Sequence, residues 1–113
     1  MTYRDCLRRL TLNDAAFVEK CTSGHLDTPS ALSIRELAVT RLAALIAIGG
    51  PEASYGAIVD AALDAGLTAD EIVDVLLRVM PTSGIPRAVG EAPKLAAALG
   101  YDIDAALEAS TPP

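Results

Sequence analysis

Two adjacent hydroxyl side chains are the first candidates for chemistry. Ser54 and Tyr55 stand side by side in the stretch GGPEASYGAIVDAALDAGLT. A serine hydroxyl is a useful nucleophile only beside a base, and a tyrosine hydroxyl can donate a proton or a hydrogen bond. The stretch holds no histidine and no cysteine to activate either group. Ser54 and Tyr55 are therefore candidate catalytic residues that need partners from elsewhere in the chain.

Two arginines are candidate binding residues for an acidic ligand. Arg41 interrupts an otherwise apolar segment, and Arg87 directly follows Pro86. A guanidinium group binds a carboxylate through two parallel hydrogen bonds, and a buried arginine requires an anionic partner. Arg41 thus predicts either a clamp for a small acid, assisted by the Tyr55 hydroxyl, or a structural ion pair to Glu52 or across subunits.

His25 is the single histidine and lies four residues after Cys21. On one helix face this spacing would let the imidazole lower the thiol pKa. The intervening Ser23 and Gly24 are typical of a helix end, so the pattern favours a buried thiol followed by a loop histidine. His25 remains a candidate general base that could reach a pocket from its loop.

Glu36 has two interpretations. The spacing Ser33-x-x-Glu36 matches a capping box, in which the serine hydroxyl accepts from the third helical N–H and the glutamate reaches back, and Thr68-x-x-Glu71 matches a second capping box. If the helix begins elsewhere, Glu36 is instead a candidate binding residue that lines a site.

The remaining acidic side chains form two pairs with a spacing of four, Asp60 with Asp64 and Asp70 with Asp74. Such pairs are typical of a solvated helix face. They lack the glycine-centred loop of a calcium site, and no Lys-Ser/Thr follows Gly49-Gly50 to make a phosphate-binding loop. The sequence therefore predicts neither a metal nor a cofactor.

Composition limits the class of protein. The chain has 113 residues, of which 51% are hydrophobic and only 4% aromatic, and helix formers dominate. This predicts an all-α fold in one domain. The net charge of −6 argues against nucleic acid or an anionic membrane surface as a partner. A mean hydropathy of +0.35 is high for so small a domain and predicts association into a homo-oligomer.

Targeting signals and cysteine usage indicate a location. The longest uncharged apolar run, Leu42 to Ile48, is far shorter than the roughly 20 residues that span a bilayer, and no signal peptide is visible. Cys6 and Cys21 do not make a disulfide framework. We expect free thiols, a cytoplasmic location and no membrane contact.

Periodicity and breakers predict six to seven helices that position the candidates. Asn13 and Ser33 are expected caps, Pro81 an expected stop and Pro93 an expected break or kink. The segment after Arg41 is apolar nearly all round and is expected to be buried on every side. The predicted helices are 3–10, 14–21, 33–48, 53–65, 68–80, 87–99 and 103–109, with a tail at 110–113.

A longer pattern resembles a known family. An Ala/Leu-rich helix, expected to be buried, ends in glycine. The next helix ends with Leu63 and Gly66. The motif Leu67-Thr68-x-x-Glu71-Ile72 and the turn Gly84-x-Pro86 come after it. This order resembles the carboxymuconolactone decarboxylase family, which includes the alkylhydroperoxidase-D-like proteins. The resemblance implies an all-helical subunit of a trimer or hexamer. It divides the single domain, 1–113, into short helices at 1–30, a family core at 31–100 and a helix and tail at 101–113.

The reactive positions depart from that pattern. Redox members carry Cys-x-x-Cys and then a histidine on the functional helix, and decarboxylase-type members keep the histidine alone. The corresponding positions here are Pro51, Ser54 and Ile58. A gapless alignment places the family glutamate of the preceding helix at Ala38, so that Glu36 is displaced by about 200° around the helix. Thiol peroxidase activity is not expected.

Two functions stay open at this point. One is a lyase- or isomerase-type enzyme that acts without redox thiols on a small carboxylate, lactone or biosynthetic intermediate through Arg41, Tyr55, Ser54 and His25. The other is a catalytically degenerate binding or structural module that keeps the oligomer. A pocket beside Tyr55 would favour the enzyme.

Overall fold

The computed structural model describes residues 1–110, which form seven helices and no strand. This confirms the all-α class. The chain divides into two compact units, Met1–Ala31 and Leu32–Pro113, which are described separately. Residues 111–113 of the expected tail lie outside the described range. Within residues 1–110, no helix has both the length and the apolar character needed to span a bilayer.

The first unit is a pair of short helices, α1 (Tyr3–Thr11) and α2 (Ala15–Ser23). The Asp14 carboxylate caps α2 by accepting from the Phe17 N–H at 3.2 Å. The expectation that Asn13 provides this cap is wrong, because Asn13 adopts the left-handed conformation of the turn with φ +54°. Phe17 is buried in this unit, as its position on α2 leads one to expect.

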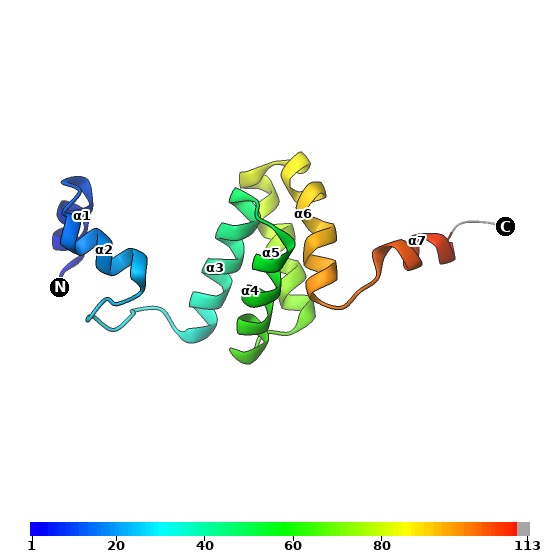
Figure 1. Cartoon of the computed structure of the whole chain (residues 1–113), viewed down its shortest axis with the longest axis horizontal. Helices are drawn as coiled ribbons and strands as arrows, with labels where there is room; N and C mark the ends of the chain where they lie inside the picture. The colour runs from blue at the N-terminus through cyan, green and yellow to red at the C-terminus, as the bar shows by residue number, and fades with distance from the viewer. Residues whose placement is uncertain (111–113) are drawn as a thin grey trace. The chain divides into compact units, whose positions relative to one another are not determined.

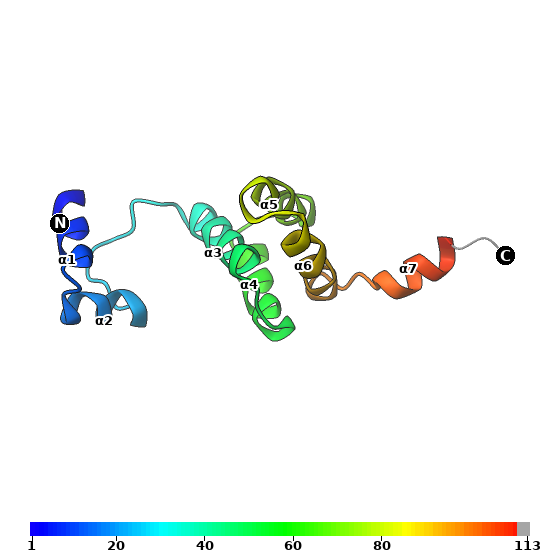
Figure 2. The same ribbon diagram turned by 90° about the horizontal axis from the view of Figure 1, so that it is seen from above.

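The second unit is built on four helices that lie side by side (Figure 1; seen from above in Figure 2). They are α3 (Ile34–Ile48), α4 (Glu52–Asp64), α5 (Ala69–Ser83) and α6 (Ile85–Ala98). The central helix is α3, which contacts the other three and buries Leu42 and Ile46 completely. Within the single chain the segment after Arg41 is not buried on every side, since Ala44 and Ala47 are exposed and Ile48 is 74% exposed.

Neither interior proline ends its helix. Pro81 lies inside the last turn of α5, which continues to Ser83, and Pro93 lies inside α6, which continues to Ala98. A proline removes one N–H donor and crowds the preceding turn, but the rest of the ladder can persist. The expected stop at Pro81 is therefore wrong, and so is a break at Pro93, while the alternative of a kink at Pro93 stays a prediction. The last helix, α7 (Ile103–Ser110), follows Gly100 and contacts α6 alone among the described helices.

The helix α5 is amphipathic, with one apolar face toward the core. Ile72 and Leu76 are buried against the core, whereas Val73 and Leu77 are exposed. Met80 is partly buried and packs against the core. The exposed pair leaves an apolar strip on the outer face of α5.

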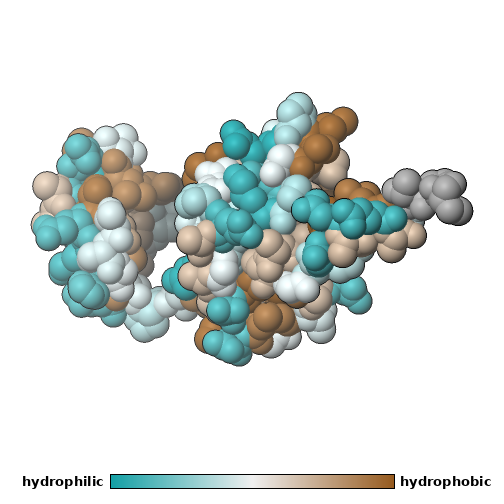
Figure 3. Space-filling model, turned by 45° about the vertical axis from the view of Figure 1, so that its right-hand side comes forward, coloured by the Kyte–Doolittle hydropathy of each residue, from teal (hydrophilic) through white to brown (hydrophobic). Residues whose placement is uncertain are grey.

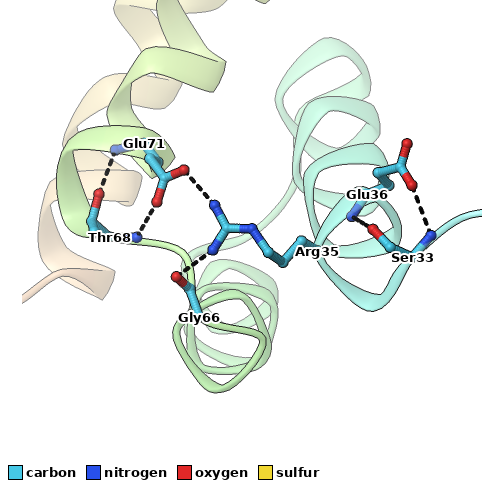
Figure 4. Close-up of polar contacts among 6 residues, drawn as sticks. All are labelled: Ser33, Arg35, Glu36, Gly66, Thr68 and Glu71. Atoms are coloured by element: carbon cyan, nitrogen blue, oxygen red, sulfur yellow. Dashed lines mark hydrogen bonds and ion pairs between the residues drawn. The ribbon is translucent and has the colours of Figure 1, made fainter.

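Two capping boxes begin α3 and α5, and both confirm the sequence analysis (Figure 4). Glu36 accepts from the Ser33 N–H at 2.8 Å, and Glu71 accepts from the Thr68 N–H at 2.9 Å. Arg35 then joins the two helix starts, because its guanidinium donates to the Glu71 carboxylate and to the Gly66 carbonyl. This contact fixes the end of α4 and the start of α5 against α3.

Acid is expected to loosen this junction. The hydrogen bond from the Thr68 N–H is the main reason why the pKa of Glu71 lies below its ordinary value of 4.5. The Arg35 guanidinium lowers this pKa further, whereas partial desolvation acts to raise it. The folded chain therefore binds this proton less readily than the unfolded chain, so the stabilisation is present above 4.5 and lost as pH falls below it. In urea unfolding, Glu71→Gln should show a weaker decline in stability with acid than the wild type. Its exposed neighbour Asp70→Asn is the control, and an unchanged pH profile for Glu71→Gln would contradict the assignment.

Candidate functional site

The outer side of the α3–α4 hairpin carries a groove of about 290 Å³. Each helix supplies residues at helical spacing, so one face of each borders the groove. Most of the lining is apolar, and one basic and one acidic side chain interrupt it. The lining residues are Ile34, Leu37, Ala38, Arg41, Ile58, Ala61, Asp64 and Ala65.

Two of these lining residues stand at the positions that the resemblance gives to functional side chains. Ala38 stands where the family glutamate is expected, and Ile58 stands where the family histidine is expected. Both border the same groove, from facing helices. Their common location supports the gapless alignment. The groove therefore has aliphatic groups at the two positions where an acid and an imidazole are expected.

Arg41 is on the groove but is not buried. Its side chain is exposed and forms no hydrogen bond or ion pair with the described part of the chain. The expected structural ion pair with Glu52 is therefore wrong within the single chain. An exposed guanidinium beside an apolar surface is free to bind an anionic ligand.

Tyr55 does not border the groove. Its side chain is completely buried, and its hydroxyl donates to Glu91 Oε1 on α6 at 3.0 Å. The same oxygen accepts from the Gly50 N–H at 2.9 Å, while Oε2 accepts from Lys94 Nζ at 2.8 Å. Lys94 also donates to the Gly50 carbonyl at 2.7 Å. We call Gly50, Tyr55, Glu91 and Lys94 the turn network, because it fastens the α3–α4 turn to α6.

The ionisation of the turn network follows from these contacts. Burial and the neighbouring Glu91 carboxylate raise the pKa of Tyr55 well above its ordinary value, so the hydroxyl remains protonated and donates. For Glu91, burial acts to raise the pKa, but hydrogen bonds from Lys94, Gly50 and Tyr55 together outweigh it and lower the pKa. Glu91 is thus a charged carboxylate with its acceptors occupied.

Sequence reasoning missed Glu91. Its signal is the pair Glu91-x-x-Lys94 inside the otherwise apolar helix GEAPKLAAAL. Residues three apart share one helix face, and a buried carboxylate there requires donors. What the sequence does not reveal is that the donors come from Gly50 and Tyr55, about 40 residues earlier.

Arg87 lies next to the turn network. It borders a shallow pocket with Ser83, Pro86, Gly90 and Glu91, and it is exposed. Its guanidinium also lies against Gly49, which has φ +84° and where a Cβ atom would stand 2.1 Å from Arg87 Nη1. Arg87 therefore covers the turn and lies apart from the residues that line the α3–α4 groove.

The other candidates do not converge on the groove. Ser54 is half-buried in the first turn of α4 and is absent from the groove lining. Glu36 serves as the cap of α3. His25 follows α2 and is exposed, and Cys6 and Cys21 are free, all three in the first unit. Within residues 1–110, no group of three or more His, Cys, Asp or Glu side chains could hold a metal ion.

Comparison with protein families gave a match that covers most of the chain. The model of the carboxymuconolactone decarboxylase family matches residues 15–98, which include α2 to α6. The chain therefore belongs to the carboxymuconolactone decarboxylase family. Neither the curated proteins nor the solved structures gave a match.

Proposed function

We propose that this family member binds a small, mainly apolar carboxylic acid, or a lactone that carries a carboxylate, in the α3–α4 groove, and that it acts without redox thiols. The single observation that carries the proposal is the exposed Arg41 guanidinium on an otherwise aliphatic groove of about 290 Å³. Such a groove accommodates an apolar body, and the guanidinium fixes the orientation of a carboxylate.

The residues of α4 support the absence of thiol chemistry. Thiol exchange needs a thiolate and a resolving partner. Pro51 and Ser54 stand where redox members of the family carry cysteines, and Ile58 replaces the histidine. The proposal therefore gives Tyr55, Ser54 and His25 no catalytic role, since none of them borders the groove.

Arg41→Ala should weaken the binding of hexanoate by about fivefold, because an exposed ion pair contributes up to about 1 kcal/mol. Hexanoate itself should bind to the wild type with a Kd on the order of 1 mM, as expected for so small a ligand. Saturation-transfer difference NMR on the full chain measures both values. Arg41→Lys should retain part of the affinity, because it keeps the charge and loses the planar fork.

The control is Arg78→Ala, which removes an exposed arginine from α5. It should leave hexanoate binding unchanged. Hexanamide, which has the same body without the charge, should bind the wild type more weakly than hexanoate. Equal binding of hexanoate by wild type and Arg41→Ala would refute the proposed site.

A second candidate is a binding or structural module that has lost its chemistry. The observation in its favour is that Ala38 and Ile58 make the groove aliphatic where the family carries an acid and a base. This candidate shares the scaffold with the first and differs in that the groove binds no small acid or lactone. Failure of hexanoate, benzoate and a set of small lactones to bind would favour it.

We further propose that protomers associate into a trimer or hexamer through exposed apolar side chains. Apolar groups lie among polar ones on the face of the molecule shown in Figure 3. Val39, Val73 and Leu77, on α3 and α5, are 38%, 39% and 51% exposed. Exposed apolar area on a small chain favours self-association.

Sedimentation velocity should show wild-type protein heavier than one protomer, and Leu77→Asp should shift it toward the protomer because it places a charge in the interface. Circular dichroism verifies that the variant is folded. Wild-type protein that sediments as a single protomer at micromolar concentration would contradict the association.

A further inference from the structure

The α3–α4 groove carries two charges of opposite sign, and neither is satisfied by the protein. Arg41 on α3 and Asp64 on α4 both border it. Both side chains are exposed, and neither has a hydrogen bond or ion pair to another described residue. Although they share one small groove, they do not form a salt bridge with each other, so each remains available to a ligand.

The hairpin places these two charges toward opposite ends of the groove. Because α3 and α4 join through the short turn at 49–51, they run antiparallel, and Arg41 lies nearer the turn than Asp64, the last residue of α4. From the rise per residue, their Cα atoms differ by about 8 Å along the hairpin. Side chains tilt toward the N-terminus of their own helix, so Arg41 and Asp64 lean toward each other from the two ends.

The space between the charges is aliphatic. Leu37, Ala38 and Ala61 lie between them along the hairpin, and none of the three offers a polar side-chain atom. A ligand that fits must therefore be apolar in its middle and polar only at its ends. A simple fatty acid would satisfy Arg41 and leave its other end beside an unpaired carboxylate.

We propose that the natural ligand of the groove is an ω-amino carboxylic acid or a close analogue, with its carboxylate on Arg41, its protonated amine on Asp64 and its methylene body against Ala38 and Ala61. The inference rests on the proposed binding of a carboxylate in this groove and adds the group at the other end. Asp64 is then the residue that determines specificity.

The test compares acids with and without a terminal amine. Saturation-transfer difference NMR on the full chain measures butanoate, hexanoate and octanoate against 4-aminobutanoate, 6-aminohexanoate and 8-aminooctanoate. We expect 6-aminohexanoate to bind about fivefold more tightly than hexanoate, as one added exposed ion pair allows. The shorter and longer pairs should show a preference of the same sign, and its size reports which separation of amine and carboxylate suits Arg41 and Asp64 best.

Asp64→Asn should abolish this preference and leave the affinity for hexanoate unchanged. Asp60→Asn is the matched control, because Asp60 is an exposed aspartate on the same helix that does not border the groove. It should retain the preference.

The outcomes separate the two proposals. Equal binding of hexanoate and 6-aminohexanoate by the wild type, or a preference that survives Asp64→Asn, would overturn the role of Asp64 and leave the carboxylate site standing. Loss of the preference in Asp60→Asn would also overturn the role of Asp64, since the summed negative charge of α4 would then explain the preference. Absence of binding for all six acids would overturn the carboxylate site itself.

Discussion

Glu91→Ala is expected to lower the free energy of unfolding by about 3 kcal/mol, because it leaves buried donors without an acceptor. The Gly50 N–H and the Tyr55 hydroxyl both donate to Glu91 Oε1, and Tyr55 is completely buried. Lys94 would lose its ionic partner as well. Urea unfolding followed by circular dichroism, at one fixed protein concentration, measures the change.

Two further variants test whether this loss of stability comes from the turn network. Glu91→Gln keeps an acceptor for Tyr55 and Gly50 but removes the charge beside Lys94, so it should lose about half as much stability. Glu108→Ala removes an exposed glutamate from α7 and should change stability by less than about 0.5 kcal/mol. If Glu91→Ala is as stable as Glu108→Ala, the network does not hold the turn.

Ala61→Phe is expected to abolish binding of hexanoate without unfolding the protein. Ala61 borders the groove and is exposed, so an aromatic ring there fills the space with little disturbance of the core. A phenylalanine side chain covers on the order of 200 Å² when packed, which is enough to occupy a groove of this size. Saturation-transfer difference NMR reports the binding, and thermal unfolding reports the fold.

The matched variant is Ala47→Phe, which adds the same ring to an exposed site of α3 outside the groove. It should bind hexanoate like the wild type. Retained binding in Ala61→Phe, with Arg41 still required, would place the carboxylate elsewhere along α3.

The sequence predicted the local features of the fold because they depend on neighbouring residues. The capping boxes at Ser33 and Thr68 need only a hydroxyl and a glutamate three residues later, and both formed. The two prolines were misjudged because a helix can continue past one lost hydrogen bond when its other contacts hold it. Asn13 was misjudged because the left-handed turn there uses Asn13 in its backbone and leaves the cap to Asp14.

The candidate site was only partly predictable for a different reason. Arg41, Ala38 and Ile58 were singled out in the sequence, and all three border one groove. Tyr55 was expected beside them, but the orientation of a helix about its axis depends on its partners, and α6 offers Glu91 to the face that carries Tyr55. Contacts between residues that lie far apart in the chain are what a single sequence does not disclose.

The α3–α4 hairpin is fastened twice, by the turn network at 49–51 and by Arg35 at the end of α4, and the groove lies between these attachments. Substitution of the exposed Ala61 therefore leaves both attachments intact, whereas Ala38 belongs to the buried core and Ile58 packs against it. This arrangement allows the ligand preference of the groove to change while the scaffold is retained. Ala61 and the exposed groove residues Ile34 and Asp64 are therefore suitable positions for a randomised library in directed evolution.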